Sequence, residues 1–367
     1  MDEKDRLLLI CLQNGLPLTP RPFDVWSAKI GADSAELLVR IQRLKKRGIF
    51  GEIKAILDPR AFYYQSAWVA MRLGQEGEEL ASRAEVLWQH PGVIYGCERE
   101  HEFNVWFFIA APSNHDLELH VRCLEKLAGA HRTLFLPVRK VFKGTDFLSS
   151  LDAQTFQAMS ERFEKRQKVG LPDLTSEEIE MVRQLQEPFP LTDEPYQEIA
   201  LRAGITEAQV LEWMRSLVGK GCLKKIGSFL KPAVVPLETR TLAVWQVPEE
   251  KLERIGPGIA EFREVLYADR RPAYPEFPYS LYTMIRAGTA AELEVVMRRI
   301  EERIGKWPQA VLVTTREFKK ERMKYFPKGL DGWWRKSRHV VETAFIMSQR
   351  PETREQGQET KKSCGDF

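Results

Sequence analysis

The chain contains 367 residues, of which 43% are hydrophobic and 29% charged, and its 55 basic side chains nearly balance 52 acidic ones. That composition is typical of a soluble globular protein with about two to four domains, and the near-neutral charge argues against a polybasic nucleic-acid coat. No apolar run reaches the ~20 residues that span a bilayer, and the acidic start does not resemble a signal peptide. The five cysteines form no CxxC pair and the six histidines no HExxH pattern. We therefore expect a cytoplasmic protein with neither a disulfide framework nor a zinc site.

The first 58 residues predict a winged helix-turn-helix. Apolar spacing and capping signals indicate helices over residues 3–14, 23–30 and about 34–47, followed by a β-wing over 49–57. Gly31 and Gly48 are placed to end the second and third helices, and Asp33 or Ser34 suits the N-cap of the third.

Residues 59–148 predict a ferredoxin-like domain with the element order βαββαβ. Strands are expected over 67–71, 93–98, 103–110 and 133–142, and helices over 77–89 and 115–128. The charged, amphipathic segment 149–172 that follows is interpreted as a linker helix.

The remainder of the chain repeats this unit. Nine residues recur at a spacing of 173 positions, namely Leu12, Gln13, Pro17, Leu18, Pro22, Gly31, Leu44, Gly48 and Ile53. This self-similarity predicts a second winged helix-turn-helix over 173–232, a second ferredoxin-like domain over 233–330, and a polar, partly disordered tail over 331–367. In the second ferredoxin-like domain, strands are expected near 242–247, 264–269, 279–286 and 310–317, and helices over 249–261 and 290–304. The expected fold class is thus α+β, a tandem repeat in which each copy joins a winged helix-turn-helix to a ferredoxin-like domain.

One hairpin differs in length between the two copies. The spacing of matched residues changes from 172 to 176 across the proline-rich segment 270–278. An insertion at a loop tip disturbs a fold little, and such loops often carry function.

The helix-turn-helix units raise the question of DNA binding. A reading helix presents Arg, Lys, Asn or Gln from its N-terminal half. The basic residues of the first unit come late in its third helix, and the second unit offers Glu207, Glu212 and Trp213 instead. Because phosphate neutralisation supplies most of the affinity for DNA, we expect no nucleic-acid partner and interpret the units as packing modules. A DNA-binding regulator remains the alternative.

Arginine and aromatic residues gather in the two hairpins and in the last strands. Such residues on a sheet suit a flat, polyanionic ligand, because rings stack on its faces and guanidinium groups hold carboxylates. The candidates are Tyr95, Arg99 and His101 in the first hairpin, Tyr267, Arg270, Arg271, Tyr274, Tyr279 and Arg286 in the second, and Arg139 and Lys319 in the last strands.

Over residues 1–328 or so, the chain resembles the siroheme decarboxylases, a family similar to the Lrp/AsnC regulators and built from two related subunits. The segments LQNGLPLTPRPF, CEREHEFNVWF and LPVRKVFK are similar to one subunit type. The segments LQEPFPL, DRRPAYPEFPYSLYTMI and TTREFKKERMKYF are similar to the other. The resemblance implies a natural fusion of both subunits, an internal pseudo-heterodimer, with further self-association left open.

The resemblance also implies an activity, the decarboxylation of two acetate side chains of siroheme, at carbons 12 and 18, to give didecarboxysiroheme in alternative haem or haem d1 biosynthesis. No cofactor or metal site of the protein is implied, because the substrate carries its own iron. Loss of CO2 leaves an electron pair that the macrocycle must accept, and a proton donor must then quench the carbon. Basic residues would orient the ring through its other carboxylates.

In this scheme the implied catalytic residues are His101, Tyr274 and Tyr279. Substrate binding falls to Tyr95, Arg99, Arg139, Tyr267, Arg270, Arg271, Arg286 and Lys319. Each candidate also has an ordinary structural alternative. His101 would be an exposed turn histidine, the tyrosines would pack in the core, and the arginines and Lys319 would be solvated charges on strands. We expect His101→Ala and Arg271→Ala each to lower turnover with the fold intact.

The second motif departs from the family pattern at two positions. Ser280 stands where Asn is common, and Arg286 stands where His is common. Because an arginine cannot give up its proton at ordinary pH, the second copy must work differently, and we expect one working pocket per chain. Two functions compete with this one. The first is a Lrp/AsnC-like regulator that responds to a tetrapyrrole, and the second is a tetrapyrrole carrier or scaffold without catalysis.

Overall fold

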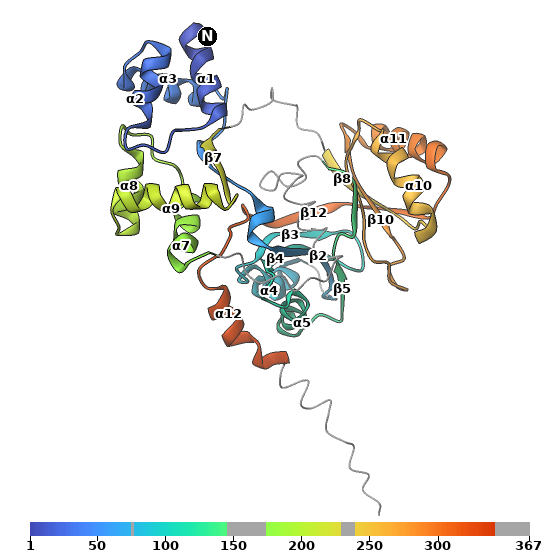
Figure 1. Ribbon diagram of the computed structural model, residues 1–367. Coiled ribbons are helices and arrows are strands. Elements are labelled where there is room, and N and C mark those ends of the chain that lie inside the picture. The colour runs from blue at the N-terminus through green and yellow to red at the C-terminus, as the bar shows by residue number, and fades with distance from the viewer. Residues whose placement is uncertain (75–76, 145–173, 229–238, 342–367) are drawn as a thin grey trace, which may run out of the picture.

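The computed structural model describes residues 1–74, 77–144, 174–228 and 239–341. It contains two helical units and two α/β domains, with the helical units at one side of the molecule (Figure 1). The first helical unit contains α1 (Glu3–Asn14), α2 (Pro22–Ile30) and α3 (Ser34–Lys46), and the second contains α7 (Ser176–Leu185), α8 (Pro195–Ala203) and α9 (Glu207–Gly219). Side-chain caps start four of these helices, from Asp2, Asp33, Thr175 and Thr206. The expected linker over 149–172 lies outside the described residues.

The wings of the two helical units pair with each other. Each unit contributes one strand, β1 (Lys54–Leu57) and β7 (Leu223–Gly227), and the two form an antiparallel two-stranded sheet. The β-wing expected over residues 49–57 is present as the single strand β1, and its pairing with β7 of the other copy was not foreseen. A lone strand leaves its backbone groups unpaired, and the equivalent strand of the other copy supplies the partner.

Each α/β domain has the expected βαββαβ order. The first contains β2 (Tyr64–Arg72), α4 (Gly77–Trp88), β3 (Val93–Arg99), β4 (Val105–Pro112), α5 (Leu117–Ala128) and β5 (Arg132–Leu136), preceded by the short 3-10 helix η1 (Pro59–Phe62). The second contains β8 (Thr239–Trp245), α10 (Glu249–Ala260), β9 (Val265–Arg270), β10 (Leu281–Ala287), α11 (Ala290–Ile304) and β11 (Gln309–Leu312). Their strand orders are β3-β4-β2-β5 and β11-β8-β10-β9, so the α+β tandem repeat is confirmed.

The two domains exchange their last strands. A single final strand was expected over 133–142 and another over 310–317, but each is split. β6 (Lys140–Lys143) joins the second sheet beside β9, and β12 (Thr314–Lys320) joins the first sheet beside β3. In the first copy the break contains Pro137, which has no N–H to continue the ladder.

Glycines and aromatic rings hold the exchanged strands in place. A Cβ on Gly256 would meet the Phe142 ring at 2.2 Å, and one on Gly96 would meet Trp88 at 2.1 Å. Phe318 of β12 stacks on Trp88, with ring centroids 5.4 Å apart. Gly256 of the second copy thus makes room for the Phe142 ring of the first copy. Gly96 makes room for Trp88, on which Phe318 of the second copy stacks.

Side chains alternate between two cores along each sheet. On β2, Val69 and Met71 face helices α4 and α5, whereas Trp68 and Ala70 face the other way. The second sheet packs α10 and α11 on its outer face in the same manner. The inner faces of both sheets belong to one large cluster that continues into the helical units, and we call its part between the sheets the inter-sheet core.

A C-terminal segment leads from β12 to α12 (Leu330–Ser337), which lies to the left of α5 in Figure 1. Part of the expected polar tail is therefore helical, while residues 342–367 lie outside the described residues. Trp334 of α12 stacks on His120 of α5, with ring centroids 4.3 Å apart. Among the described helices, none has the length and apolarity to cross a bilayer.

A chain of hydrogen-bonded imidazoles lies beside α12. His90 Nδ1 accepts the Gly92 N–H (2.9 Å), so its Nε2 is left to donate to His120 Nδ1 (2.8 Å). The chain continues from His120 Nε2 to His115 Nδ1 (3.2 Å) and from His115 Nε2 to Asp331 (3.2 Å). Every link requires a neutral imidazole that donates through Nε2 and accepts through Nδ1.

Candidate functional site

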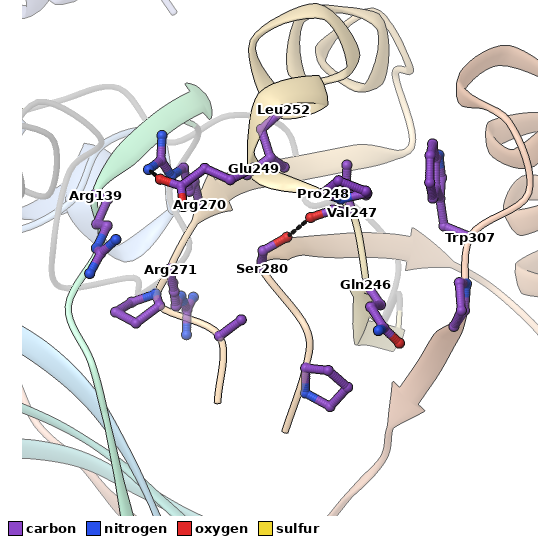
Figure 2. A pocket seen from close by; sticks show the side chains of 14 residues that line it. Arg139, Gln246, Val247, Pro248, Glu249, Leu252, Arg270, Arg271, Ser280 and Trp307 are labelled. Carbon is purple, nitrogen blue, oxygen red and sulfur yellow. Dashed lines mark hydrogen bonds and ion pairs between the residues drawn. The ribbon is translucent and has the colours of Figure 1, made fainter. Parts of the chain in front are cut away.

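A pocket of about 460 Å³ opens beside the proline-rich loop of the second copy. Its wall includes the guanidinium groups of Arg139, Arg270 and Arg271, together with Ser280 and Trp307 (Figure 2). We call it the arginine pocket. Its size lies in the range of small-molecule sites, and three of the residues predicted to bind substrate line it.

Both copies contribute to the arginine pocket. Arg139 precedes β6, and its backbone N–H donates to the Arg270 carbonyl (2.8 Å) because β6 runs beside β9. The Arg270 guanidinium forms an ion pair with Glu249, whereas the Arg139 side chain is exposed. Ser280 donates its hydroxyl to the Val247 carbonyl (2.5 Å), the dashed contact in Figure 2. The strand exchange therefore brings Arg139 of the first copy to the wall of this pocket.

Arg271 is the most deeply buried of the three arginines, with a 3% exposed surface. Its Nε donates to Asp269 Oδ1 (2.9 Å) and its Nη2 to Asp269 Oδ2 (3.0 Å). The guanidinium lies over Tyr282 (4.1 Å to the centroid) and near Trp68 of the first sheet (5.4 Å). Within the described part of the chain, its buried Nη1 has no hydrogen-bond partner.

Arg99 is the counterpart of Arg271 in the first copy. It is also buried, and it lies over Trp106 (5.5 Å) as Arg271 lies over Tyr282. Its Nη1 donates to the Leu312 carbonyl (2.7 Å), and its Nε has no partner among the described residues. Arg99 does not line the arginine pocket.

His101 meets the second copy through Phe277. The His101 and Phe277 rings are 5.3 Å apart, and Tyr279 contacts the same phenylalanine at 4.9 Å. His101 Nδ1 accepts the Phe103 N–H (3.1 Å), so the neutral ring carries its proton on Nε2. Burial lowers the pKa of His101, and Glu102 partly opposes that effect. The structure thus brings two predicted catalytic residues to one aromatic cluster.

The proline-rich loop is closed on itself and docked on the first copy. Backbone hydrogen bonds link Tyr274 and Phe277 in both directions (3.0 Å each), and Glu276 forms an ion pair with Arg132. The Tyr274 hydroxyl donates to the Phe135 carbonyl (2.8 Å). Burial raises the pKa of Tyr274, which keeps its phenol protonated at neutral pH.

Tyr95 and Tyr267 occupy equivalent inner-face positions. Tyr95 is half-buried, edge-on to Trp68 at 5.7 Å, and Tyr267 is buried. Burial raises the pKa of both phenols, and the neighbouring Asp269 charge raises the pKa of Tyr267 further. Both tyrosines lie within the inter-sheet core rather than in the wall of the pocket.

Two predicted binding residues lie away from the pocket. Arg286 lies near the far end of β10, where its backbone N–H donates to the Glu264 carbonyl (2.8 Å). Lys319 donates to the Trp88 carbonyl at the end of α4 (2.8 Å). Lys143, at the matching place in β6, donates to the Phe262 carbonyl (2.6 Å), so the two lysines form a symmetric pair of strand anchors.

Four residues at this site had not been singled out as ligands or catalysts from the sequence: Trp68, Asp269, Phe277 and Tyr282. The available signal was alternation, because Asp269 falls on the same face of β9 as Tyr267 and therefore points into the core. A charged residue at such a position requires a buried partner. Among the described residues, no group of His, Cys, Asp and Glu suits a metal ion.

Comparison with known proteins identifies the family. A profile of the siroheme decarboxylase NirDL-like HTH domain matches residues 5–50 and 178–223, and one of the AsnC-like ligand binding domain matches 63–143 and 237–319. A siroheme decarboxylase of Hydrogenobacter thermophilus is 32% identical over 336 residues, which cover 91% of this chain and 98% of that protein. This chain belongs to the siroheme decarboxylase family.

Other members of the family exist as separate subunits. The siroheme decarboxylase alpha subunit of Desulfovibrio desulfuricans is 34% identical over 143 residues, covering 39% of this chain and 81% of the subunit. The crystal structure of the siroheme decarboxylase NirDL in complex with an iron-uroporphyrin III analogue matches with a TM-score of 0.69 and 28% identity, over 93% of this chain and 100% of that one. These matches are consistent with two fused subunit types.

Proposed function

We propose that this protein is a siroheme decarboxylase, a carboxy-lyase that converts the acetate side chains at carbons 12 and 18 of siroheme to methyl groups. The observation that carries the proposal is the end-to-end match to the Hydrogenobacter thermophilus enzyme. The arginine pocket supports it, because Arg139 and Arg271 offer donors for carboxylates at the boundary of the two copies. The product, didecarboxysiroheme, would enter haem or haem d1 synthesis.

We assign substrate binding to the arginines of the pocket. Proton delivery is assigned to His101 and Tyr279, which both contact the Phe277 ring. A carboxylate arm of the macrocycle held by Arg139 and Arg271 would fix the ring against the inner faces of the sheets. When CO2 leaves, the electron pair passes into the conjugated ring, so no further cofactor is needed. The His101 Nε2–H and the Tyr279 hydroxyl are the donors that would return a proton to the carbon.

The helical units are assigned a packing role, with no nucleic-acid partner. Arg40 of α3 is held by Asp2 (2.7 Å) and Asp5 (2.8 Å), and Arg43 by Asp5 (2.7 Å), so these guanidinium groups are engaged internally. The units also contact each other, since the Tyr196 hydroxyl donates to the Pro17 carbonyl (2.8 Å). Together with the paired wings, these contacts favour an internal pseudo-heterodimer over a DNA reader. We place the protein in the cytoplasm as part of the same proposal.

The test is an anaerobic assay of the full chain with siroheme. We expect a Soret band on mixing, release of CO2, and a product lighter by two molecules of CO2. A Soret band without CO2 release would replace the enzyme by a tetrapyrrole carrier. Salt-dependent binding to duplex DNA without turnover would favour a regulator.

A further inference from the structure

The two copies differ at one buried position of equivalent hairpins. Asp269 of β9 lies opposite Tyr282 of β10, and Cys97 of β3 lies opposite Trp106 of β4. Both positions face the inter-sheet core, and each precedes by two residues an arginine, Arg271 or Arg99. A carboxylate therefore accompanies the arginine in the second copy and a thiol in the first.

Asp269 controls which edge of the Arg271 guanidinium is occupied. A guanidinium carries five N–H donors in a fixed plane. Asp269 takes the edge formed by Nε and Nη2, at 2.9 and 3.0 Å, and the Tyr282 ring covers one face at 4.1 Å. The tip atom Nη1 is left buried and without a partner in the described part of the structure.

The first copy has the opposite arrangement. Of the two terminal nitrogens of Arg99, Nη1 donates to the Leu312 carbonyl (2.7 Å), and the buried atom without a described partner is Nε. Both atoms are buried, so the two copies differ in which of the two arginines borders a pocket. Arg271 lines the arginine pocket and Arg99 does not.

A buried charge pair with one unmet donor calls for an explanation. Buried polar atoms are nearly always hydrogen-bonded, so the unmet Nη1 donor calls for a partner. Asp269 is 0% exposed, so its charge is stable only while Arg271 compensates it. The pair is close to neutral as a unit, which leaves Nη1 as a directional donor rather than a diffuse positive charge.

We propose that Asp269 is a positioning residue that orients Arg271 so that its Nη1 holds a carboxylate arm of the substrate in the arginine pocket. This rests on the proposed function and assigns the substrate-anchoring pocket to the second copy. Asp269 acts only through Arg271 and does not touch the substrate.

The test is a double-mutant cycle on binding, read by Soret titration of the full chain with siroheme. Asp269→Asn should weaken binding about tenfold, the cost of losing one oriented charge-assisted hydrogen bond. Arg271→Gln should weaken it at least as much. The double variant should bind no more weakly than Arg271→Gln alone, because Asp269 has no role once Arg271 is gone.

Cys97→Ala is the matched control, since Cys97 occupies the equivalent position without an orienting role. It should leave affinity within about twofold of the parent, as expected for a substitution outside the site. Additive losses in the double variant, or parental affinity in Asp269→Asn, would overturn the proposal. If Asp269→Asn alone does not fold, Asp269→Glu takes its place in the cycle, because it keeps the compensating charge and displaces the carboxylate from the Nε–Nη2 edge; parental affinity in Asp269→Glu would then overturn the proposal.

The outcomes separate this proposal from the proposed function. Parental protein that binds siroheme without releasing CO2 would refute the enzyme, while the binding cycle would still report on Asp269. Parental protein that releases CO2 but shows additive losses would refute only the role of Asp269.

Discussion

The hairpin of the first copy carries Cys97 and His101, whereas that of the second carries Asp269, Arg271 and a proline-rich loop. The backbones match and exchange strands symmetrically, so the two sites are built on the same scaffold. Five of the six histidines lie in the first copy, at positions 90, 101, 115, 120 and 131, and the second ferredoxin-like domain has none. The packing is thus shared by the two copies, whereas the histidines are concentrated in the first copy and the buried Asp269–Arg271 pair lies in the second.

The largest expected effect comes from removing the two equivalent arginines. Arg271→Ala should destabilise the fold by about 3–5 kcal/mol, because it leaves the buried Asp269 carboxylate uncompensated. The sequence had suggested that this variant would spare the fold, and the buried ion pair revises that expectation. Arg99→Ala should cost about 1–3 kcal/mol, since it removes a charged hydrogen bond without stranding a charge.

Urea unfolding of both variants measures this difference. Addition of Asp269→Asn to Arg271→Ala should recover part of the lost stability, and the equivalent Cys97→Ala should not rescue Arg99→Ala. Equal losses of stability in Arg271→Ala and Arg99→Ala would mean that the Asp269 carboxylate does not make the two copies respond differently.

The second prediction tests the histidine of the first copy. His101→Gln should lower single-turnover CO2 release about 100-fold, the lower range for loss of a general acid. Siroheme affinity should stay within about threefold, because His101 is assigned to proton transfer rather than anchoring. His131→Gln is the control, since His131 is exposed and outside the cluster. A loss of affinity with unchanged turnover would move His101 to the binding residues.

The third prediction concerns the imidazole chain, a feature of the first copy alone. Burial lowers the pKa of His90 well below its usual range and that of His120 to about 3. Both rings are therefore neutral in the fold, whereas in the unfolded chain they take up protons below about pH 6.5. Their contribution to stability is complete above pH 6.5 and is lost as the pH falls toward the folded pKa values.

Protonation of His90 and of His120 in the unfolded chain should each lower the free energy of unfolding by about 1.4 kcal/mol per pH unit below 6.5. Urea unfolding between pH 7 and pH 5 measures the slope, and His120→Gln should reduce it by about half. Hydrogen exchange at pH 5 should quicken first in α5 and α12 and leave α10 and α11 protected. An unchanged slope in His120→Gln would place the acid sensitivity elsewhere.

The smallest expected effect comes from the matched lysines Lys143 and Lys319. Each ammonium donates to a helix-end carbonyl of the other copy, so Lys143→Met and Lys319→Met should each lower stability by about 1 kcal/mol. Turnover should remain within about twofold, because neither lysine lines the arginine pocket. A selective loss of activity in Lys319→Met would return Lys319 to the substrate-binding residues.

Local sequence patterns were sufficient for the repeat, the order of elements and the choice of hairpins. Apolar periodicity and caps such as Asp33 and Thr206 act within a few residues, so the helices could be located directly from the sequence. Arg139, Arg270 and Arg271 were singled out from the same kind of local pattern and line one pocket, and their binding of an anion stays a prediction.

The pairing of edges and the orientation of side chains required long-range contacts. Residues 133–142 alternate like one strand, and nothing local indicates that β6 leaves for the other sheet, where Gly256 makes room for Phe142. Likewise, nothing local indicates that β1 pairs with β7, or which groups the arginines contact. Periodicity tells which face a residue occupies, but for Phe142 and Arg99 the neighbour that meets it there, Gly256 or the Leu312 carbonyl, comes from a segment more than a hundred positions away. Even Asp269 and Arg271, only two residues apart, form a buried ion pair only because the tertiary structure removes both from water, which raises the cost of leaving either charge unpaired.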